Sequence, residues 1–298
     1  MLRTIIPSAL LLIVLCVVSG IAGCAPAPGI VSRHTVDHDG RAMDYRLFTP
    51  GRTASTPAPL VVALHRFAET PDTMAAMTGF DNLAQRESFV VVYPKGDDRR
   101  FDFLSSSRDD AGAILAVVDD VRGRLPIDER RVYLTGASNG GFMTYALAHH
   151  APERFAAIAP VMALMPERFA TPDAPPVPIL IVVGTEDGIV PPDAESLGPV
   201  RTLTTREATS YWRERHVCAP QPERRRVPDT DPRDGTRTVR MSWSTPEGQT
   251  PVELYTVYGG GHTWPGGNEP VPAFIVGRIA RDWNATEAIW AFFQRFER

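Results

Sequence analysis

Short runs of consecutive apolar residues alternate along the chain with longer segments whose apolar positions recur every three or four residues. The runs at 60–64 and 179–183 are typical of strands that are buried on both faces. The segments 73–86 and 205–216 have the helical spacing that lets one side of a helix pack on a sheet. This alternation predicts an α/β fold with a mostly parallel central sheet, helices on both faces and a single domain. Further strands are predicted at 89–94, 131–137, 155–161, 239–242 and 252–257, and further helices around 114–121 and over 142–150.

Turn and cap residues add detail near the two ends of this pattern. Two alternating segments flank Asp39 and Gly40, which predicts a hairpin over 34–49. Asn284, with Glu287 three residues later, predicts the beginning of the last helix. The segment 223–236 is rich in arginine and proline, and it is predicted to be an exposed loop.

The first residues of the chain have the pattern of an export signal. Arg3 precedes an apolar run over 5–18, which is too short to span a membrane and ends in small residues. Ile21-Ala22-Gly23-Cys24 resembles the bacterial lipobox, in which the cysteine is lipidated; in the alternative, Cys24 is incidental to a plain signal peptide. We expect a protein anchored to the bacterial cell envelope by lipid, or a secreted one. The predicted parts are a signal peptide over 1–23, a lipidated N-terminus and linker over 24–31, and the α/β domain over 32–298.

Charge and cysteine content limit the partners that the sequence favours. The net charge of −4 over 298 residues gives no basis for nucleic-acid binding. Cys16 is removed with the predicted signal and Cys24 would carry lipid, so Cys218 has no partner for a disulfide. Because no cysteine or histidine spacing is typical of a zinc site, we predict no metal.

The pentapeptide Gly136-Ala137-Ser138-Asn139-Gly140 follows a predicted strand and precedes a predicted helix. In this G-x-S-x-G arrangement a sharp turn exposes the serine hydroxyl, and the glycines avoid clashes with the strained backbone. Ser138 is therefore a candidate nucleophile. The backbone N–H of Asn139 lies at a helix N-terminus and is a candidate oxyanion donor.

A serine nucleophile needs a base and an orienting acid, which follow it in the order acid then histidine in this type of fold. Asp187 follows a buried strand, and His262 lies in a later glycine-rich loop. The alternative is that both are ordinary turn residues, and Glu186 and Asp193 are neighbouring candidates for the acid.

Three segments resemble the secreted esterase family of polyhydroxybutyrate depolymerase-like and feruloyl or acetylxylan esterases. They are 134–145 around Ser138, 184–191 around Asp187 and 260–267 around His262, and the resemblance extends from about Val36 to Phe296. It implies an α/β-hydrolase fold without metal or organic cofactor. It also implies that Ser138 is the nucleophile, Asp187 the orienting acid and His262 the general base.

The chain departs from the family pattern after the strand at 60–64. The usual His-Gly-x-Gly-Gly loop is His65-Arg66-Phe67-Ala68-Glu69, so a positive φ would fall on Arg66, Ala68 or Glu69. Phe67 still has the position whose N–H should face the oxyanion. Cys218 matches a family cysteine whose partner, near 243–245, is missing.

These patterns predict a carboxylic-ester hydrolase that forms an acyl-enzyme. We expect short-chain, hydroxyacyl or polysaccharide-linked feruloyl and acetyl esters, because Trp264 would form one wall of the cleft and Phe101 and Phe103 another. His65 is also expected to contact the substrate. The segment 95–110 should border the cleft, and no lid helix for long acyl chains is evident. The alternatives are a serine peptidase of the same fold and a non-catalytic carbohydrate-binding surface protein.

Overall fold

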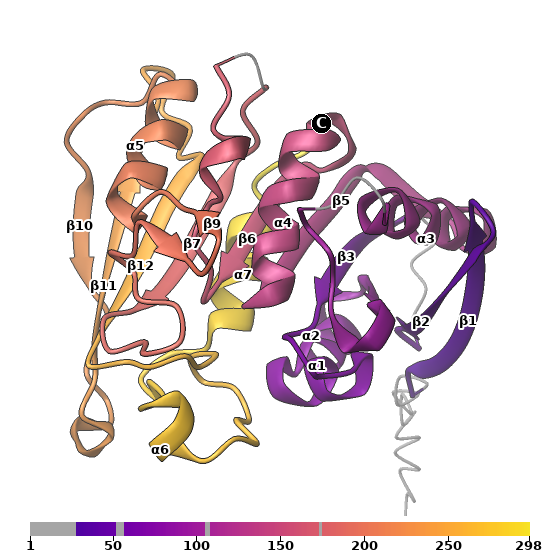
Figure 1. The fold of residues 1–298 in the computed structure, drawn as a ribbon, viewed down its shortest axis with the longest axis horizontal. Coiled ribbons are helices and arrows are strands. Elements are labelled where there is room, and N and C mark those ends of the chain that lie inside the picture. The colour runs from indigo at the N-terminus through magenta and orange to yellow at the C-terminus, as the bar shows by residue number, and fades with distance from the viewer. Residues whose placement is uncertain (1–27, 52–56, 105–107, 173–174) are drawn as a thin grey trace, which may run out of the picture.

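The central feature of the structure is a ten-stranded sheet in the order β1-β2-β4-β3-β5-β6-β7-β12-β11-β10 (Figure 1). The computed structural model describes residues 28–51, 57–104, 108–172 and 175–298. Neighbouring strands from β4 to β12 run parallel, and antiparallel pairs complete both edges. The strands are β1 Ile30–His38, β2 Arg41–Thr49, β3 Ala58–Leu64, β4 Val90–Pro94, β5 Ile127–Ala137, β6 Ala157–Val161, β7 Ile179–Gly184, β10 Glu223–Arg226, β11 Arg237–Trp243 and β12 Val252–Tyr258, with β8 Ser196–Leu197 and β9 Val200–Arg201 in a separate small hairpin.

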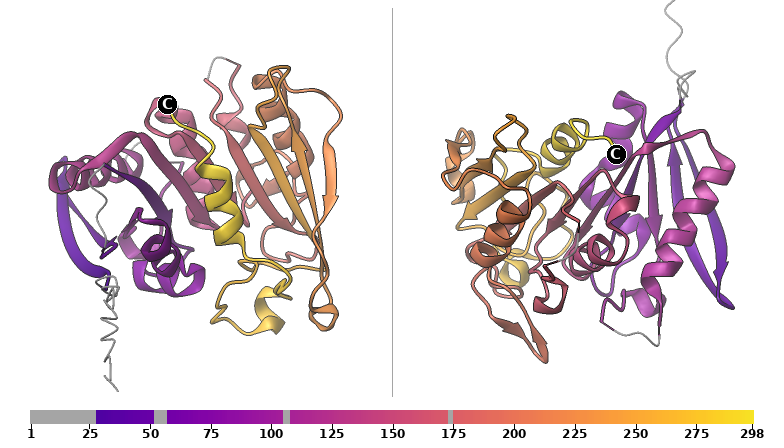
Figure 2. Two further views of the ribbon diagram at one scale, coloured as in Figure 1. Left: turned by 180° about the vertical axis from the view of Figure 1, so that it is seen from behind. Right: turned by 90° about the horizontal axis from the view of Figure 1, so that it is seen from above.

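Helices cover both faces of the sheet, and a separate apolar core fills the space on each side (Figures 1 and 2). One face carries α3 Asp110–Arg124, α4 Asn139–His150 and α5 Thr205–Arg215. The other carries α1 Pro71–Thr78, α2 Phe80–Glu87 and α7 Ala285–Phe293. The predicted architecture is confirmed. The remaining helices are α6 Ala273–Val276 and the 3₁₀ turns η1 Asp97–Arg99, η2 Pro152–Arg154, η3 Glu167–Phe169 and η4 Pro232–Asp234.

Two of the predicted elements were wrong in detail. The helix expected over 73–86 is two helices, because Gly79 has a φ of 69° and ends α1 before α2 begins. The loop expected over 223–236 contains the strand β10 and the turn η4. All four side chains of β10 are exposed, and charged residues on an edge strand hide the alternation that identifies a strand. The predicted hairpin and the capping of the last helix by Asn284 are confirmed.

The predicted signal peptide and the lipidation site Cys24 lie outside the described residues. The first strand of the described chain, β1, begins at Ile30. Within the described part of the chain, none of the helices has both the length and the apolar composition needed to cross a membrane.

The parallel strands position the chemistry of the molecule. In a parallel sheet the carboxyl ends of the strands meet at one edge, where the loops that follow them come together. The loops after β3, β5, β7 and β12 contain His65, Ser138, Asp187 and His262 respectively. Four segments that are far apart in the sequence therefore share one edge of the sheet.

Candidate active site

Ser138 lies at a sharp turn between β5 and α4, as the sequence predicts. Its φ and ψ are 53° and −115°, its N–H donates to the carbonyl of Val161 at 2.9 Å, and its side chain is partly exposed. The turn needs glycine on both sides. A Cβ on Gly136 would lie 2.2 Å from the carbonyl oxygen of Gly140, and a Cβ on Gly140 would lie 2.3 Å from that of Leu64. The close packing of backbone on backbone therefore holds the strained serine in place.

Asp187 and His262 form a buried pair. Asp187 Oδ2 lies 2.7 Å from His262 Nδ1, and each residue is only 3% exposed. Because a carboxylate only accepts hydrogen bonds, Nδ1 donates this one, and in the neutral ring Nε2 is left with the lone pair that a general base needs. The second oxygen of Asp187 accepts the N–H groups of Ile189 and Val190 at 2.9 and 2.7 Å. These contacts fix the orientation of the carboxylate, and through it that of the imidazole ring.

The two other acids near Asp187 are directed elsewhere. Glu186 forms an ion pair with Arg278 at 2.9 Å, and both side chains are more than half exposed. Asp193 lines a cavity beneath α5. Of the three carboxylates that the sequence offers, Asp187 is the one in contact with His262.

The loop that carries His262 extends from β12 across the edge of the sheet to the loop after β3. The N–H of Asn268 donates to the carbonyl of Met77 at the end of α1, at 2.9 Å. Glu269 forms an ion pair with Arg66 at 2.9 Å. Since β5 lies between β3 and β12 in the sheet, this path brings the loop of His262 over the edge at which Ser138 lies.

Two backbone donors are open in the loops that follow β3 and β5. In the loop after β3, Ala68 N–H donates to Arg99 O and Glu69 N–H to Arg66 O. The N–H groups of Phe67 and Asn139 donate to no other residue of the described chain. They follow the neighbouring strands β3 and β5, which is the arrangement that an oxyanion hole needs.

The loop after β3 is stabilised by ion pairs in place of glycines. Arg66 is 5% exposed, and its guanidinium binds Glu69 at 2.5 and 2.9 Å and both oxygens of Glu269 at 2.9 and 3.0 Å. The positive φ falls on Ala68, at 62°. The sequence alone does not reveal this cluster, because nothing local indicates that Glu269 pairs with a residue 203 positions earlier.

His65 has a structural position, which corrects the expectation that it contacts the substrate. Its side chain is fully buried, Nδ1 donates to Arg66 O at 2.7 Å, and Nε2 accepts the N–H of Gly96 at 3.1 Å. Its ring packs against Phe101 with a centroid distance of 4.6 Å. Burial lowers the pKa of His65 below its ordinary value of 6.5, so the neutral ring that these contacts require is favoured.

The expectation that Trp264 forms a wall of the cleft is also wrong. Trp264 is fully buried, its Nε1–H donates to Thr286 at 3.0 Å, and its ring meets Phe80 edge to face. It anchors the loop of His262 to the helical layer, because a large ring with one satisfied polar atom packs best in the core. Phe101 is buried against His65, and Phe103 is stacked on Phe142 at 5.0 Å.

Asn139 contributes more than the N–H that the sequence indicates. Its side-chain oxygen accepts the N–H of Phe101 at 2.7 Å, and its side-chain nitrogen donates to the carbonyl of Phe101 at 3.0 Å. The residue after Ser138 is thus bonded to the backbone of Phe101, which places Phe101 beside the candidate site. Among the described residues, no group of three or more potential ligands could hold a metal ion, and Cys218 is a free thiol.

A mostly parallel sheet, a serine at a strand-to-helix turn and an Asp–His pair on later loops define an α/β hydrolase. Solved structures agree on the fold. The acetyl xylan esterase from Aspergillus awamori aligns with a TM-score of 0.64 and 16% identity, over 88% of this chain and 99% of that one.

The chain belongs to a family of esterases that includes the PHB depolymerases. Residues 43–166 match the family model described as esterase PHB depolymerase. “Putative esterase NocK” of Nocardia uniformis subsp. tsuyamanensis is 30% identical over 81% of this chain and 76% of its own length. The acetylxylan esterase A of Emericella nidulans is 30% identical over 44% of this chain, which spans 46% of that relative. The chain is therefore a carboxylic ester hydrolase, as the resemblance predicted.

Proposed function

We propose that the chain hydrolyses esters by a serine mechanism in which Ser138, His262 and Asp187 act together. His262 Nε2 takes the proton of the Ser138 hydroxyl as Oγ attacks the ester carbonyl. The same imidazole then returns that proton to the departing alcohol, which leaves the acyl group on Oγ. A water, activated by His262 in the same way, releases the acid. The observation that supports this proposal best is the buried 2.7 Å contact between Asp187 and His262.

The two open backbone donors complete the proposed mechanism. Negative charge develops on the carbonyl oxygen as the tetrahedral intermediate forms, and donors placed in advance stabilise it. The N–H groups of Phe67 and Asn139 would supply that stabilisation. One such donor is typically worth about 2.7–4 kcal/mol of barrier.

The proposed substrates are short-chain, hydroxyacyl or polysaccharide-linked acetyl and feruloyl esters. Curated relatives that share part of their length with this chain are described as acetylxylan esterase, feruloyl esterase B and poly(3-hydroxyalkanoate) depolymerase C. Phe67 carries one of the proposed oxyanion donors, and the N–H of Ile189 bonds to Asp187. The side chains of both residues are exposed, so they would offer apolar contact to a small acyl group.

We propose further that the enzyme acts outside the cytoplasm, anchored through lipid on Cys24. The support is the lipobox-like sequence Ile21-Ala22-Gly23-Cys24 at the end of the apolar run. Mass spectrometry of the mature N-terminus should show an acylated Cys24. A mature N-terminus at another residue, without acyl mass, would contradict the anchor.

Replacement of the proposed nucleophile tests the mechanism. Ser138→Ala should lower kcat about 10⁶-fold on p-nitrophenyl acetate while the protein stays folded. Ser210→Ala, a serine that lines the cavity beneath α5, is the matched control and should keep wild-type activity. A Ser138→Ala protein that keeps more than about a hundredth of wild-type kcat would exclude Ser138 as nucleophile.

A substrate panel tests the proposed specificity. Acetyl, 3-hydroxybutyryl and feruloyl esters should react with higher kcat/KM than long-chain acyl esters. The corresponding anilides should react far more slowly, and efficient amide cleavage would favour a peptidase. Higher kcat/KM on long-chain esters would overturn the substrate assignment and leave the serine mechanism standing.

A further inference from the structure

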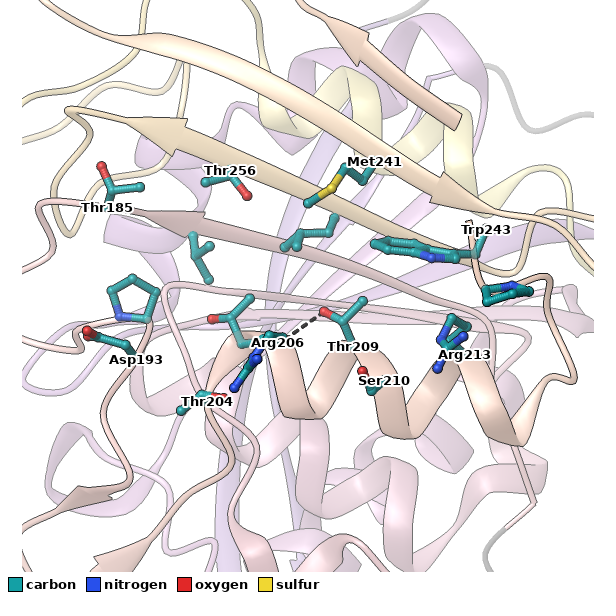
Figure 3. A pocket seen from close by; sticks show the side chains of 15 residues that line it. Thr185, Asp193, Thr204, Arg206, Thr209, Ser210, Arg213, Met241, Trp243 and Thr256 are labelled. Carbon is teal, nitrogen blue, oxygen red and sulfur yellow. Dashed lines mark hydrogen bonds between the residues drawn. The ribbon is translucent and has the colours of Figure 1, made fainter. Parts of the chain in front are cut away.

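A cavity of about 760 Å³ lies between α5 and the sheet, and neither Ser138 nor His262 lines it (Figure 3). Its sheet wall is one face of three neighbouring strands, because alternate residues of a strand point to the same side. These residues are Val183 of β7, Leu254 and Thr256 of β12, and Met241 and Trp243 of β11. Apart from the hydroxyl of Thr256 and the indole N–H of Trp243, this wall is apolar.

The helix wall of the cavity is polar. Arg206, Thr209, Ser210 and Arg213 follow one another at i, i+3, i+4 and i+7, so they lie along one side of α5. Figure 3 shows this row of side chains opposite Met241, Trp243 and Thr256. A helix that packs on a sheet normally presents apolar residues there. The polar row leaves an open space where a core would otherwise form.

The charges around this space favour an anion. The guanidinium of Arg206 forms no hydrogen bond or ion pair with another described residue, and its one electrostatic neighbour is the adjacent Glu207, whose carboxylate caps Thr204 at the start of α5. Arg213 is paired only with the adjacent Glu214, at 2.9 Å, whose side chain is 69% exposed. Asp193 is the one carboxylate among the lining residues. Thr205 also lines the cavity and is only 7% exposed. Its buried hydroxyl oxygen has no hydrogen-bond partner.

We propose that this cavity binds a small monocarboxylic acid with an apolar body, whose carboxylate pairs with Arg206 while the body lies against Trp243, Met241 and Leu254. A guanidinium matches a carboxylate with two parallel N–H donors. The volume falls in the range of ligand pockets, which combine apolar walls with a few polar groups. This site is separate from the proposed catalytic residues, and its occupancy does not depend on the role of Ser138.

Calorimetric titration of the full-length protein with octanoate tests the proposal. Octanoate should bind with a stoichiometry of one, and Arg206→Gln should weaken binding about tenfold, as expected for the loss of a charge-assisted contact. Octan-1-ol, which keeps the apolar body without the charge, should bind wild type about tenfold more weakly. Arg201→Gln is the matched control, since Arg201 is an exposed arginine paired with Glu167 outside the cavity, and it should leave binding unchanged.

A second variant places the bound acid in this cavity and not at the catalytic edge. Met241→Trp adds bulk to the open space and should abolish octanoate binding, while activity on p-nitrophenyl acetate and the far-ultraviolet circular dichroism stay as in wild type. Binding that neither Arg206→Gln nor Met241→Trp weakens would overturn the proposal, as would the absence of binding. Loss with Met241→Trp but not with Arg206→Gln, or equal affinity for octan-1-ol, would overturn the assignment of a carboxylate ligand.

Discussion

Ser138 and Ala68 both have positive φ angles, 53° and 62°, although neither is glycine. They follow the neighbouring strands β5 and β3, and each loop supplies one of the two open backbone donors. Their surroundings differ. Ser138 is held by backbone packing that leaves no room for a Cβ on Gly136 or Gly140. Ala68 lies in a loop that is fixed by the buried guanidinium of Arg66.

The difference shows two ways in which a fold can hold a strained backbone. Steric exclusion around the serine depends on Gly136 and Gly140, two positions to either side of it, and on the backbone of Leu64 at the end of β3. The ion-pair cluster depends on Glu269, which comes from the loop of His262. The second solution therefore ties the donor of Phe67 to the loop that carries the proposed base, so a change at either end should affect both. Four substitutions test this comparison.

The largest effect is expected at Arg66. Arg66→Met would leave Glu69 and Glu269, which are 14% and 8% exposed, without their shared cation. Removing one partner of a buried ion pair typically costs about 3–5 kcal/mol of stability. Urea unfolding should show a loss of that size. The control Arg33→Met removes a mostly exposed pair with Asp72 and should cost under about 1 kcal/mol. Equal losses in the two variants would show that the cluster does not hold the loop.

Gly140→Ala tests the steric solution. The added Cβ would meet the backbone of Leu64 at 2.3 Å, so β3 and α4 must move apart. We expect a loss of about 3 kcal/mol in the free energy of unfolding, together with a loss of esterase activity. Gly123→Ala near the end of α3 meets nothing within 4 Å and should gain about 0.5–1 kcal/mol. A Gly140→Ala protein as stable as Gly123→Ala would contradict the account of the turn.

The pH dependence of stability should report on His65. Its pKa is lower in the folded protein than its ordinary value of 6.5, so the unfolded chain binds more protons below that pH. Stability should therefore fall as pH drops below about 6.5, with a slope of up to about 1.36 kcal/mol per pH unit from this group. Burial also lowers the pKa values of His149 and His216, which contribute in the same direction.

The variant His65→Gln separates the contribution of His65 to the pH dependence of stability from those of His149 and His216. Urea unfolding at several pH values between 5 and 8 should show a weaker pH dependence for the variant than for wild type. Identical pH dependence in the two proteins would mean that His65 does not stay neutral through its contacts with Arg66 and Gly96.

The smallest effect is expected at Ala68. Glycine adopts a positive φ without steric cost, but it also gives the unfolded chain more freedom. Ala68→Gly should therefore raise stability by at most about 1 kcal/mol, with kcat on p-nitrophenyl acetate unchanged. In the helix α1, Ala75→Gly should lower stability by about 1 kcal/mol. If thermal unfolding showed the two glycines to be equally destabilising, Ala68 would not be strained.

The sequence predicted the parts of the site that depend on short segments. The glycines around Ser138, the buried strand before Asp187 and the glycine-rich loop around His262 are all visible within a few residues. The ion pair of Arg66 and the burial of Trp264 depend on contacts with Glu269, Phe80 and Thr286, which only the folded chain brings together. An aromatic residue beside a proposed base suggests a cleft wall, but whether its ring faces solvent or the core is decided by packing.

The central claim is that Ser138 becomes the acylated residue, and a fluorophosphonate probe tests it most directly. After the protein has reacted with the probe and been digested, mass spectrometry should find one adduct, on Ser138. His262→Ala should react far more slowly, because nothing then removes the hydroxyl proton. An adduct on another residue, or no adduct in a protein that hydrolyses p-nitrophenyl acetate, would contradict the proposed mechanism.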